Sequence, residues 1–286
     1  MRRALASTAV ATSMALLTLG GPTLSPTSAD PPAEWSHNPA SAVGPARWGD
    51  VGFPTCSRGT RQSPVNIETS AATRVGGPPL RLRYAASDVT LANTGHALEG
   101  QIPAGVNNTL RVGSEQYELT QYHFHAPSEH AIDGVRADVE AHFVHANSAG
   151  DTAVVGVLYR IGPRPNKALG RILRSASATT GVAVELGRAN PAKMFKGIKA
   201  IRMKAGGALR VRSFYAYDGS LTTPACTEGI RWSVLAEGGH VSSRAVAHLH
   251  EVIAQFPDND GYPNNNRPLQ PLNGRVVKHR GLLQTW

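Results

Sequence analysis

The stretch QYHFHAPSEHAIDGVRADVEAHFVH, residues 121–145, holds five of the chain's eleven histidines. Side chains in a β-strand alternate between the two faces of the sheet. Alternation places His123 and His125 on one face of the first half, while His142 lies in the second half. Between the halves, Asp133-Gly134 is a strong signal for a two-residue hairpin turn. The pattern predicts two neighbouring strands that present three imidazoles on one shared face.

A hairpin centred on Asp133-Gly134 sets a definite register for these two strands. It puts His125 directly opposite His142, with their Cβ atoms about 4.5–5.5 Å apart. His123 then lies two residues along on the same face. Pro127 weakens the pairing in the inner part of this hairpin.

Three imidazoles on one face of adjacent strands can converge on one metal ion, because Zn–N bonds are only about 2.0–2.1 Å long. A ligating imidazole usually needs its outer N–H held by an acceptor. Gln121 and Glu140 each lie two residues before a candidate ligand and on its own face. A set of ordinary core or surface histidines is the alternative. Three neutral ligands would leave zinc its charge and an open fourth position.

The rest of the chain favours a mainly β protein with a few surface helices. Gly, Pro, Asn and Asp clusters separate short β-leaning runs, and no composition shift or repeat marks a second domain. The expected architecture is one large, mostly antiparallel, twisted sheet. Predicted strands fall within 80–86, 89–100, 117–125, 139–146, 153–162, 209–217 and 230–237, and predicted helices within 167–176 and 242–256. Ser242 or Ser243 is the expected cap of the second helix.

The N-terminus has the anatomy of a secretory signal. Met1-Arg2-Arg3 precedes an apolar run, and small residues Thr27 and Ala29 stand before a cleavage point. We therefore expect residues 1–29 to be a signal peptide and residues 30–286 to be the mature domain. The protein is expected to be exported, to the medium, the periplasm or the cell-wall side, by either the general or the twin-arginine route. No segment is long and apolar enough to predict a transmembrane span.

Export bears on the two cysteines, Cys56 and Cys226. Two distant thiols in an oxidising compartment are expected to form a disulfide. Two unpaired buried thiols are the alternative.

Positive charge is concentrated in residues 160–212, which carry thirteen Lys and Arg against one acid, Glu185. Such a stretch can favour anionic partners. Phe195 is the single Phe, Tyr or Trp in this stretch. The aromatic rings on which bases could stack are therefore missing, and nucleic acid is not an expected partner. A solvated face is the first interpretation, and weak wall or surface binding is the second.

The ordered motifs of the chain resemble those of the α-class carbonic anhydrases, in the exported bacterial form. The resemblance runs over about residues 35–275 and is far more specific than an H-x-H pair. The matching segments are QSPVNI (62–67), NTGHAL (93–98), QYHFHAPSEH (121–130), EAHFVH (140–145), GSLTTPAC (219–226), RWSVL (231–235) and NNRPLQPLNGR (265–275).

The resemblance implies reversible, zinc-dependent hydration of carbon dioxide to bicarbonate and a proton by zinc-bound hydroxide, in a centre at the base of a cleft on the central strands. It makes His123, His125 and His142 the zinc ligands, with Gln121 and Glu140 orienting them. Side activity on small activated esters could occur in the same site. The partners implied are the small molecules carbon dioxide and bicarbonate, and the sequence does not indicate an oligomeric state.

The resemblance also assigns the residues around the metal. Thr222 matches the threonine that accepts a hydrogen bond from the hydroxide and donates one to the acid matched by Glu129. Thr223 matches a substrate contact, and His96 matches the proton shuttle. The apolar wall that receives carbon dioxide is matched by Val144, Val154, Leu221 and Trp232.

Three positions depart from the family pattern. His37 stands where a tyrosine is common, Thr94 where an asparagine is common, and Ala225 where a second proline is usual. The first two bear on proton transfer. Two other classes stay open: a different zinc hydrolase, for which no H-E-x-x-H helix is present, and a binding module that has lost catalysis, which would be expected to lack a ligand or the threonine.

Overall fold

A computed structural model of the chain describes residues 34–281, apart from 104, 200 and 204–207. The predicted signal peptide, residues 1–29, lies outside these described residues. Among the described residues, no helix has the length and apolar character needed to cross a membrane.

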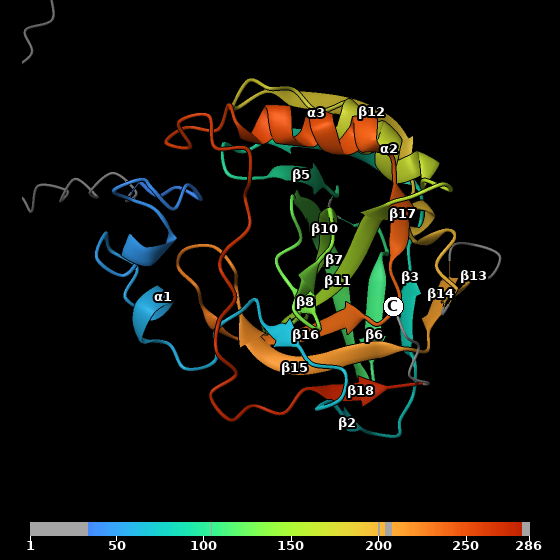
Figure 1. The fold of residues 1–286 in the computed structure, drawn as a ribbon. Coiled ribbons are helices and arrows are strands. Elements are labelled where there is room, and N and C mark those ends of the chain that lie inside the picture. Colours follow the sequence, from blue (N-terminus) through green and yellow to red (C-terminus); the bar gives the residue numbers. More distant parts are fainter. Residues whose placement is uncertain (1–33, 104, 200, 204–207, 282–286) are drawn as a thin grey trace, which may run out of the picture. The chain divides into compact units, whose positions relative to one another are not determined.

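Short strands dominate the fold, as predicted (Figure 1). The helices are α1 (Thr55–Arg58), α2 (Lys167–Arg174) and α3 (Ser243–Ile253), with 3-10 turns η1 (Pro45–Arg47) and η2 (Pro191–Phe195). The first strands are β1 (Asn66–Ile67), β2 (Thr73–Arg74), β3 (Leu80–Arg83), β4 (Ser87–Asn93), β5 (Leu98–Gln101), β6 (Thr109–Val112), β7 (Glu115–His125), β8 (Ala131–Ile132) and β9 (Val135–Arg136). The others are β10 (Val139–Ala146), β11 (Thr152–Ile161), β12 (Ala183–Ala189), β13 (Ile201–Met203), β14 (Ala208–Val211), β15 (Phe214–Ser220), β16 (Glu228–Leu235), β17 (Gly239–Val241) and β18 (Lys278–Arg280).

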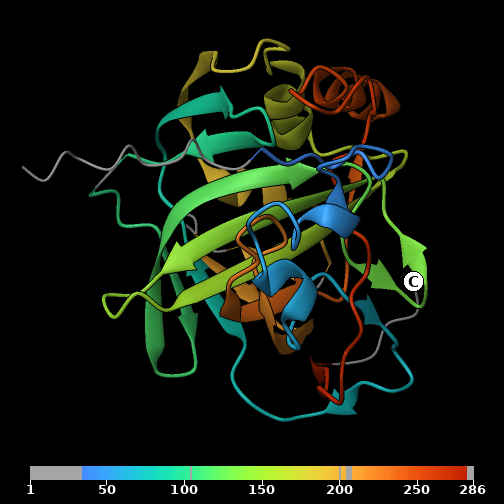
Figure 2. The same cartoon turned by 90° about the vertical axis from the view of Figure 1, so that its left-hand side faces the viewer.

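Within the described part of the chain, one sheet of fifteen strands carries the fold, and its longest path runs β13-β14-β3-β6-β7-β10-β11-β16-β15-β18-β2. Most neighbours are antiparallel. The exceptions are β11 with β16 and β17, and β18 with β2. Strands β7 and β10 lie in the middle of this order and run side by side (Figure 2). The predicted large, mostly antiparallel sheet is thereby confirmed.

Alternation along the central strands builds the core on one of their faces. Tyr122 and Phe124 of β7, with Ala141 and Phe143 of β10, are buried in the largest apolar cluster. Helices α2 and α3 add Leu169 and Leu249, among others, to the same cluster. The opposite face of β7 and β10 is therefore left to the histidines and their polar neighbours.

Both predicted helices form, with shorter ends than expected. Asn166 begins α2 by accepting a hydrogen bond from the backbone N–H of Leu169. Ser242, one of the two predicted caps, accepts from the N–H of Ala245 at the start of α3. Each cap satisfies an N–H that has no partner within the helix.

Several strands escaped sequence prediction because their patterns are short. β6, β12 and β13 lie outside the expected runs, and the expected run 209–217 divides into β14 and β15 between Val211 and Phe214. A small second sheet pairs β1 with β8 and β8 with β9. β1 and β12 obtain their partners, β8 and β4, from distant segments, which local alternation does not reveal. β6, β9 and β13 pair with strands that are adjacent in the sequence, but each is too short to show a clear alternation.

The predicted hairpin is correct at its turn and wrong at its base. Ile132 pairs with Val135 around Asp133-Gly134, as expected. Further out, however, His142 pairs with His123 rather than with His125. The segment from Ala126 to His130 leaves the sheet and takes two more residues than the returning strand. Because a shift of two preserves the side-chain alternation, all three histidines keep their common face.

A buried carboxylate supports this departure from the hairpin. Glu140 Oε2 accepts hydrogen bonds from the backbone N–H groups of Glu129 and His130, at 2.9 and 2.8 Å. Ser128 bridges to the returning strand, since its N–H donates to the carbonyl oxygen of Ala137 and its Oγ accepts from the N–H of Ala137. The backbone groups that leave the ladder therefore find other partners.

Candidate metal centre

The structure brings the three predicted histidines together on β7 and β10. Their ring nitrogens lie within 4.8 Å of one another, and the rings of His125 and His142 are buried. His142 Nδ1 lies 3.2 Å from His123 Nε2. Two ligands of one tetrahedral zinc ion, with bonds of about 2.0–2.1 Å, stand about 3.3 Å apart. The spacing of these two nitrogens fits that geometry.

Each of the three rings is held from its outer side, so that one nitrogen is left facing the others. His123 Nδ1 lies 2.8 Å from Gln121 Oε1, and His142 Nε2 lies 3.0 Å from Glu140 Oε1. These are the two acceptors expected from the sequence. The third ring is fixed by a group that the sequence did not indicate, because His125 Nδ1 lies 2.8 Å from the backbone carbonyl of Asn265. A main-chain acceptor has no side-chain pattern by which it could have been predicted.

The protonation of these rings suits a metal ion. Burial lowers the pKa of His123 well below its ordinary value, and His125 and His142 lower it further. Burial also lowers the pKa of His125. Neutral imidazole is the form that binds metal. Among the described residues, His125 Nε2 is buried without a hydrogen-bond partner, as a nitrogen reserved for an ion would be. His142 Nε2 also lacks one by hydrogen-bond angle, but Glu140 Oε1 lies at ion-pair distance from it, 3.0 Å.

Glu140 is an ionised carboxylate in the interior. Burial alone would raise its pKa, but the neighbouring His130 and His142 hold the pKa well below the usual range. Its Oε1 atom lies between these two imidazoles, 2.8 Å from His130 Nδ1 and 3.0 Å from His142 Nε2. The carboxylate can therefore fix the orientation of the His142 ring.

His130, Glu140 and His142 also lie close enough to suggest a second metal group. His130, however, is already bonded on both sides, because its Nε2 lies 2.6 Å from the Tyr217 hydroxyl. That hydroxyl in turn lies 2.9 Å from Ser63 Oγ. This cluster is a hydrogen-bonded chain behind the three-histidine site.

Glu129 is buried beside the three histidines and is oriented by the chain's C-terminal segment. Its Oε1 accepts a 2.8 Å hydrogen bond from the backbone N–H of Arg267. Its Oε2 lies 3.5 Å from His125 Nε2 and has no hydrogen-bond partner among the described residues. The hydrogen bond expected between Thr222 and Glu129 is therefore not formed in this structure. Thr222 itself is buried and Thr223 is half-buried.

The predicted apolar wall forms a row across three strands next to the histidines. Val144 of β10 pairs with Val154 of β11, which pairs with Trp232 of β16. These three and Leu221 belong to one apolar cluster. The Trp232 ring centroid lies 4.8 Å from that of His142. An apolar surface thus borders one side of the candidate centre.

The ring of Trp35, in the described N-terminal segment (residues 34–54), packs against the predicted proton shuttle. His96 is half-buried and stacks on Trp35, with ring centroids 3.8 Å apart. His37 is buried edge-on against Trp35, at 5.0 Å, and both its ring nitrogens lack hydrogen-bond partners among the described residues. Burial, with smaller effects of His125 and His96, holds the pKa of His37 well below its ordinary value. Burial also lowers the pKa of His96, although Asp258 opposes this.

The loop after β15 is tied down at several points. Cys226 forms the predicted disulfide with Cys56, with Cα atoms 5.0 Å apart. The backbone carbonyl of Cys226 accepts a hydrogen bond from Gln62 Nε2 at 3.1 Å. Within the loop, the N–H of Leu221 donates to the carbonyl of Thr227. Thr222 and Thr223 are therefore carried by a loop fixed on both sides.

Comparison with known proteins identifies the family. The sequence profile of the eukaryotic-type carbonic anhydrases matches residues 43–281. A carbonic anhydrase of Neisseria gonorrhoeae is 36% identical over 235 residues, which cover 82% of this chain and 83% of that protein. Among solved structures, the α-carbonic anhydrase of Photobacterium profundum is 36% identical with a TM-score of 0.71, covering 85% of this chain and 99% of its own. The α-carbonic anhydrase of Thermovibrio ammonificans, solved with the inhibitor sulfanilamide, is 32% identical with a TM-score of 0.73, covering 86% of this chain and 99% of its own.

Proposed function

This chain belongs to the eukaryotic-type carbonic anhydrase family, and on that premise we propose that it hydrates carbon dioxide at a zinc centre held by His123, His125 and His142. The family's reaction is the reversible conversion of carbon dioxide and water to bicarbonate and a proton. One observation carries the zinc assignment: each ring has its outer nitrogen within 3.0 Å of an acceptor oxygen and its other nitrogen turned toward the other two rings. A zinc ion bound there would supply the Lewis acidity that turns water into a nucleophile near neutral pH.

The surrounding residues orient the reactants. In this proposal the Thr222 hydroxyl accepts a hydrogen bond from the nucleophile, and Glu129 accepts one from Thr222. Glu129 is suited to that part because the N–H of Arg267 fixes its other oxygen. Such orientation can supply a large share of a rate enhancement.

Carbon dioxide is uncharged and weakly polar, which suits an apolar surface. The row of Val144, Val154 and Trp232, with Leu221 beside it, borders His142. We assign this row to substrate binding and Thr223 to a polar contact with bicarbonate. Small activated esters could enter the same site and be hydrolysed as a side reaction.

His96 is the proposed carrier of the product proton. It is half-buried and therefore reaches both the interior and solvent, and histidine titrates in the range that proton transfer requires. His37 is less suited, because burial makes its protonation at neutral pH unfavourable. The stacked Trp35 ring gives His96 a defined position.

Export of the protein is part of the same proposal. The disulfide between Cys56 and Cys226 is a feature of proteins in oxidising compartments. Together with the sequence of residues 1–29, it supports secretion or retention outside the cytoplasmic membrane.

Metal analysis combined with stopped-flow carbon dioxide hydration tests the central proposal. His142→Ala should lose most of its zinc and its activity, because two imidazoles and water hold the ion poorly. His240→Ala, which alters an exposed histidine outside the site, should keep both. Circular dichroism would check that the His142 variant is folded. Full zinc occupancy with wild-type turnover in that variant would rule out the ligand set.

A further inference from the structure

Four arginines from separate parts of the sequence stand in one row on the sheet. Arg202 of β13 pairs directly with Arg210 of β14, and Arg210 pairs with Arg81 of β3. Arg81 pairs in turn with Arg111 of β6. Because neighbouring strands lie about 4.8 Å apart, this arginine row spans about 14 Å.

The arginine row lies on the outer face of the sheet. Leu80, Leu82 and Leu209 alternate with the arginines along the same strands and are buried in the core. Arg81, Arg111 and Arg202 are exposed, and Arg210 is half-buried. Arg83 lies two residues beyond Arg81 and is exposed on the same face.

Like charges directly opposite each other on neighbouring strands destabilise a sheet. Among the described residues, no carboxylate forms an ion pair with any member of the arginine row. Arg111 Nη2 donates a hydrogen bond to an uncharged acceptor, the amide oxygen Oε1 of Gln116, at 3.2 Å. The chain therefore keeps four adjacent cations that form no ion pair with its own described acids.

We propose that the arginine row docks a linear polymer of alkylene phosphodiesters. Guanidinium groups match phosphate oxygens in a bidentate manner, and a line of evenly spaced cations suits a chain with one anion per repeat. The exposed large apolar residues of the described chain, Val135, Ile161, Val182, Leu269 and Val276, include no aromatic ring for stacking bases and none on these four strands. Single-stranded nucleic acid, whose bases stack on aromatic rings, and an inserted membrane surface are therefore poorer fits.

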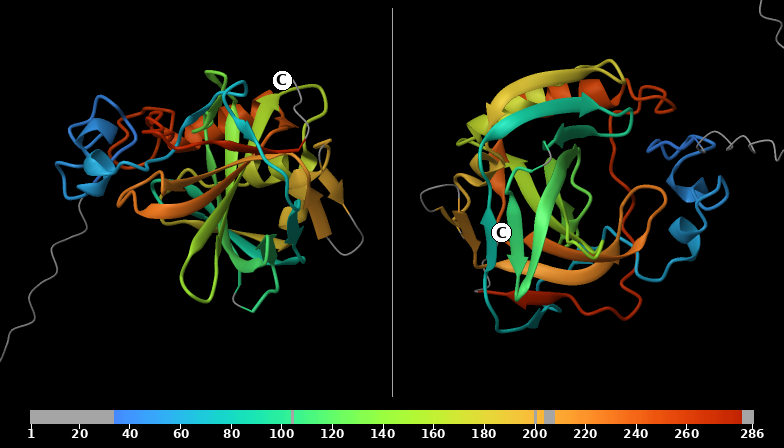
Figure 3. Two further views of the ribbon diagram at one scale, coloured as in Figure 1. Left: turned by 90° about the horizontal axis from the view of Figure 1, so that it is seen from below. Right: turned by 180° about the vertical axis from the view of Figure 1, so that it is seen from behind.

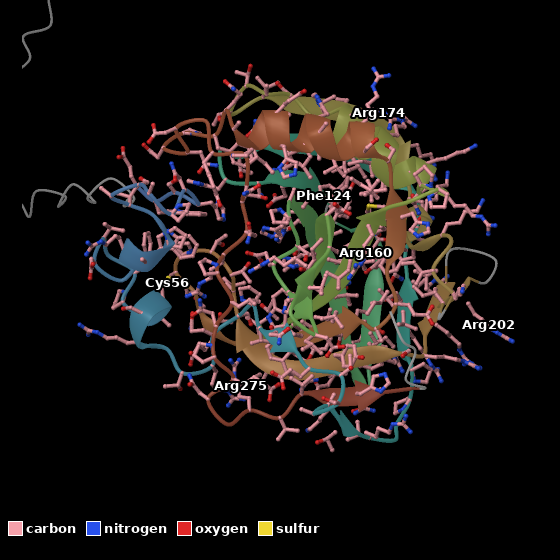
Figure 4. All side chains as sticks on the ribbon, viewed as in Figure 1. Cys56, Phe124, Arg160, Arg174, Arg202 and Arg275 are labelled. Carbon is pink, nitrogen blue, oxygen red and sulfur yellow. A yellow bond between two sulfur atoms is a disulfide. The ribbon has the colours of Figure 1, made fainter. Side chains whose placement is uncertain are left out.

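The position of the arginine row leaves the candidate centre accessible. β13, β14 and β3 lie on one flank of the molecule, opposite α1 and the N-terminal segment (Figures 1 and 3). Arg202 projects from that flank, and Cys56 marks the opposite one (Figure 4). The N-terminal flank is the one whose Trp35 stacks on His96. A polymer on the arginine row would hold the enzyme with its proton carrier turned away from the polymer.

Binding of fluorescently labelled poly(glycerol phosphate) to the mature protein, followed by anisotropy, tests this surface. Four phosphate contacts predict a slope of log affinity against log salt of about −3, or roughly a 50-fold loss between 50 and 200 mM salt. Arg81→Gln/Arg210→Gln should bind several-fold more weakly and reduce that salt effect to roughly sevenfold. The matched control Arg58→Gln/Arg244→Gln removes the same charge at two exposed positions away from the row and should bind like the wild type.

Two further readouts separate a docking role from a structural one. The melting temperature of Arg81→Gln/Arg210→Gln should stay the same or rise, because a repulsion is relieved. Carbon dioxide hydration should be unchanged in the variant and in the polymer complex, so the surface can fail independently of the catalytic proposal. Equal weakening by the control pair would overturn the proposal. Tighter binding of DNA or of anionic lipid vesicles than of the polymer, at equal charge concentration, would also overturn it.

Discussion

At the residue scale, five histidines close together in sequence have three different environments. His123, His125 and His142 face one another, while His130 is bonded between Glu140 and Tyr217. His145 lies on the core face, where its Nε2 is 2.7 Å from the Tyr84 hydroxyl. Strand alternation explains why His142 and His145 diverge, since they are an odd number of residues apart on one strand.

The proposed role of Thr222, orienting the nucleophile, depends on its side-chain hydroxyl. Thr222→Ala should keep zinc and fold but lose more than tenfold in kcat/KM for hydration, about 1.4 kcal/mol of barrier, because the nucleophile loses its orienting acceptor. Thr227→Ala, in the same loop and exposed, serves as the matched control. A loss smaller than tenfold in stopped-flow assays would show that Thr222 is not the orienting group.

His96 should affect proton release alone. In His96→Ala we expect kcat to fall in weak buffer while kcat/KM is spared, because attack on carbon dioxide precedes proton transfer. Added imidazole should restore much of the lost turnover by carrying the proton itself. Equal losses in kcat and kcat/KM without rescue would mean that His96 acts on the chemistry or the fold.

The buried His37 provides a check on that assignment. Because burial lowers its pKa well below the ordinary value, His37→Phe should remove little of the turnover that remains in His96→Ala. If the remaining turnover disappears in the His37/His96 double variant, His37 is a second carrier.

At the element scale, strand β10 contributes side chains to both faces of the sheet. Its Glu140, His142 and Val144 face the candidate centre, whereas Ala141, Phe143 and His145 face the core. Its even register shift relative to β7 moved His142 opposite His123 without changing either face. A shift by one residue would instead have buried all three site residues in the apolar cluster.

His145 makes the fold sensitive to acid. Burial lowers its pKa to about 3, so the unfolded chain binds more protons than the folded one between pH 6.5 and that value. The stability contributed by neutral His145 is complete above pH 6.5 and is lost as pH falls. Wild-type protein should lose about 2 kcal/mol more unfolding free energy between pH 7 and 5 than His145→Gln does.

Urea unfolding in the presence of a chelator measures this difference without metal binding. The Gln variant retains a group that can bond to Tyr84, and His240→Gln, at an exposed position, is the matched control. Identical losses between pH 7 and 5 in wild type and His145→Gln would exclude His145 as the source.

At the scale of the whole molecule, distant segments are tied together next to the loop that carries Thr222. Arg267 donates from its guanidinium to Gln62 Oε1 and to the carbonyls of Ser63 and Cys56, all at 2.8 Å. Its cation lies 5.5 Å from the Trp48 ring, within reach of a cation–π interaction. The disulfide adds a covalent link between the same N-terminal region and the loop of Thr222.

Reduction of the disulfide should lower the melting temperature of the mature protein. The bond joins residues 170 apart, and the chain-entropy relation gives about 5 kcal/mol for a loop of that length. Calorimetry with and without reductant measures the effect, and Cys56→Ala/Cys226→Ala should not respond to reductant. Two thiols titrated in the native exported protein would contradict the bridge.

Local pattern was enough to predict much of this protein. Alternation assigned the faces of β7 and β10, Asp133-Gly134 fixed a turn, and Ser242 began a helix, because each depends on residues near it in sequence. The three histidines and two of their acceptors, Gln121 and Glu140, followed from the same alternation. Their roles in catalysis remain predictions for the experiments above.

Three features were decided only by the tertiary structure, because each depends on groups that are far apart in the chain. The acceptor of His125 is a carbonyl 140 residues away, and a main-chain atom has no sequence pattern. The register at the base of the hairpin depended on how Glu140 bonds the backbone that leaves the sheet. The arginine row exists because β13, β14, β3 and β6 pair in one register. Sequence specifies side chains and their local alternation, but long-range pairing decides which of them meet.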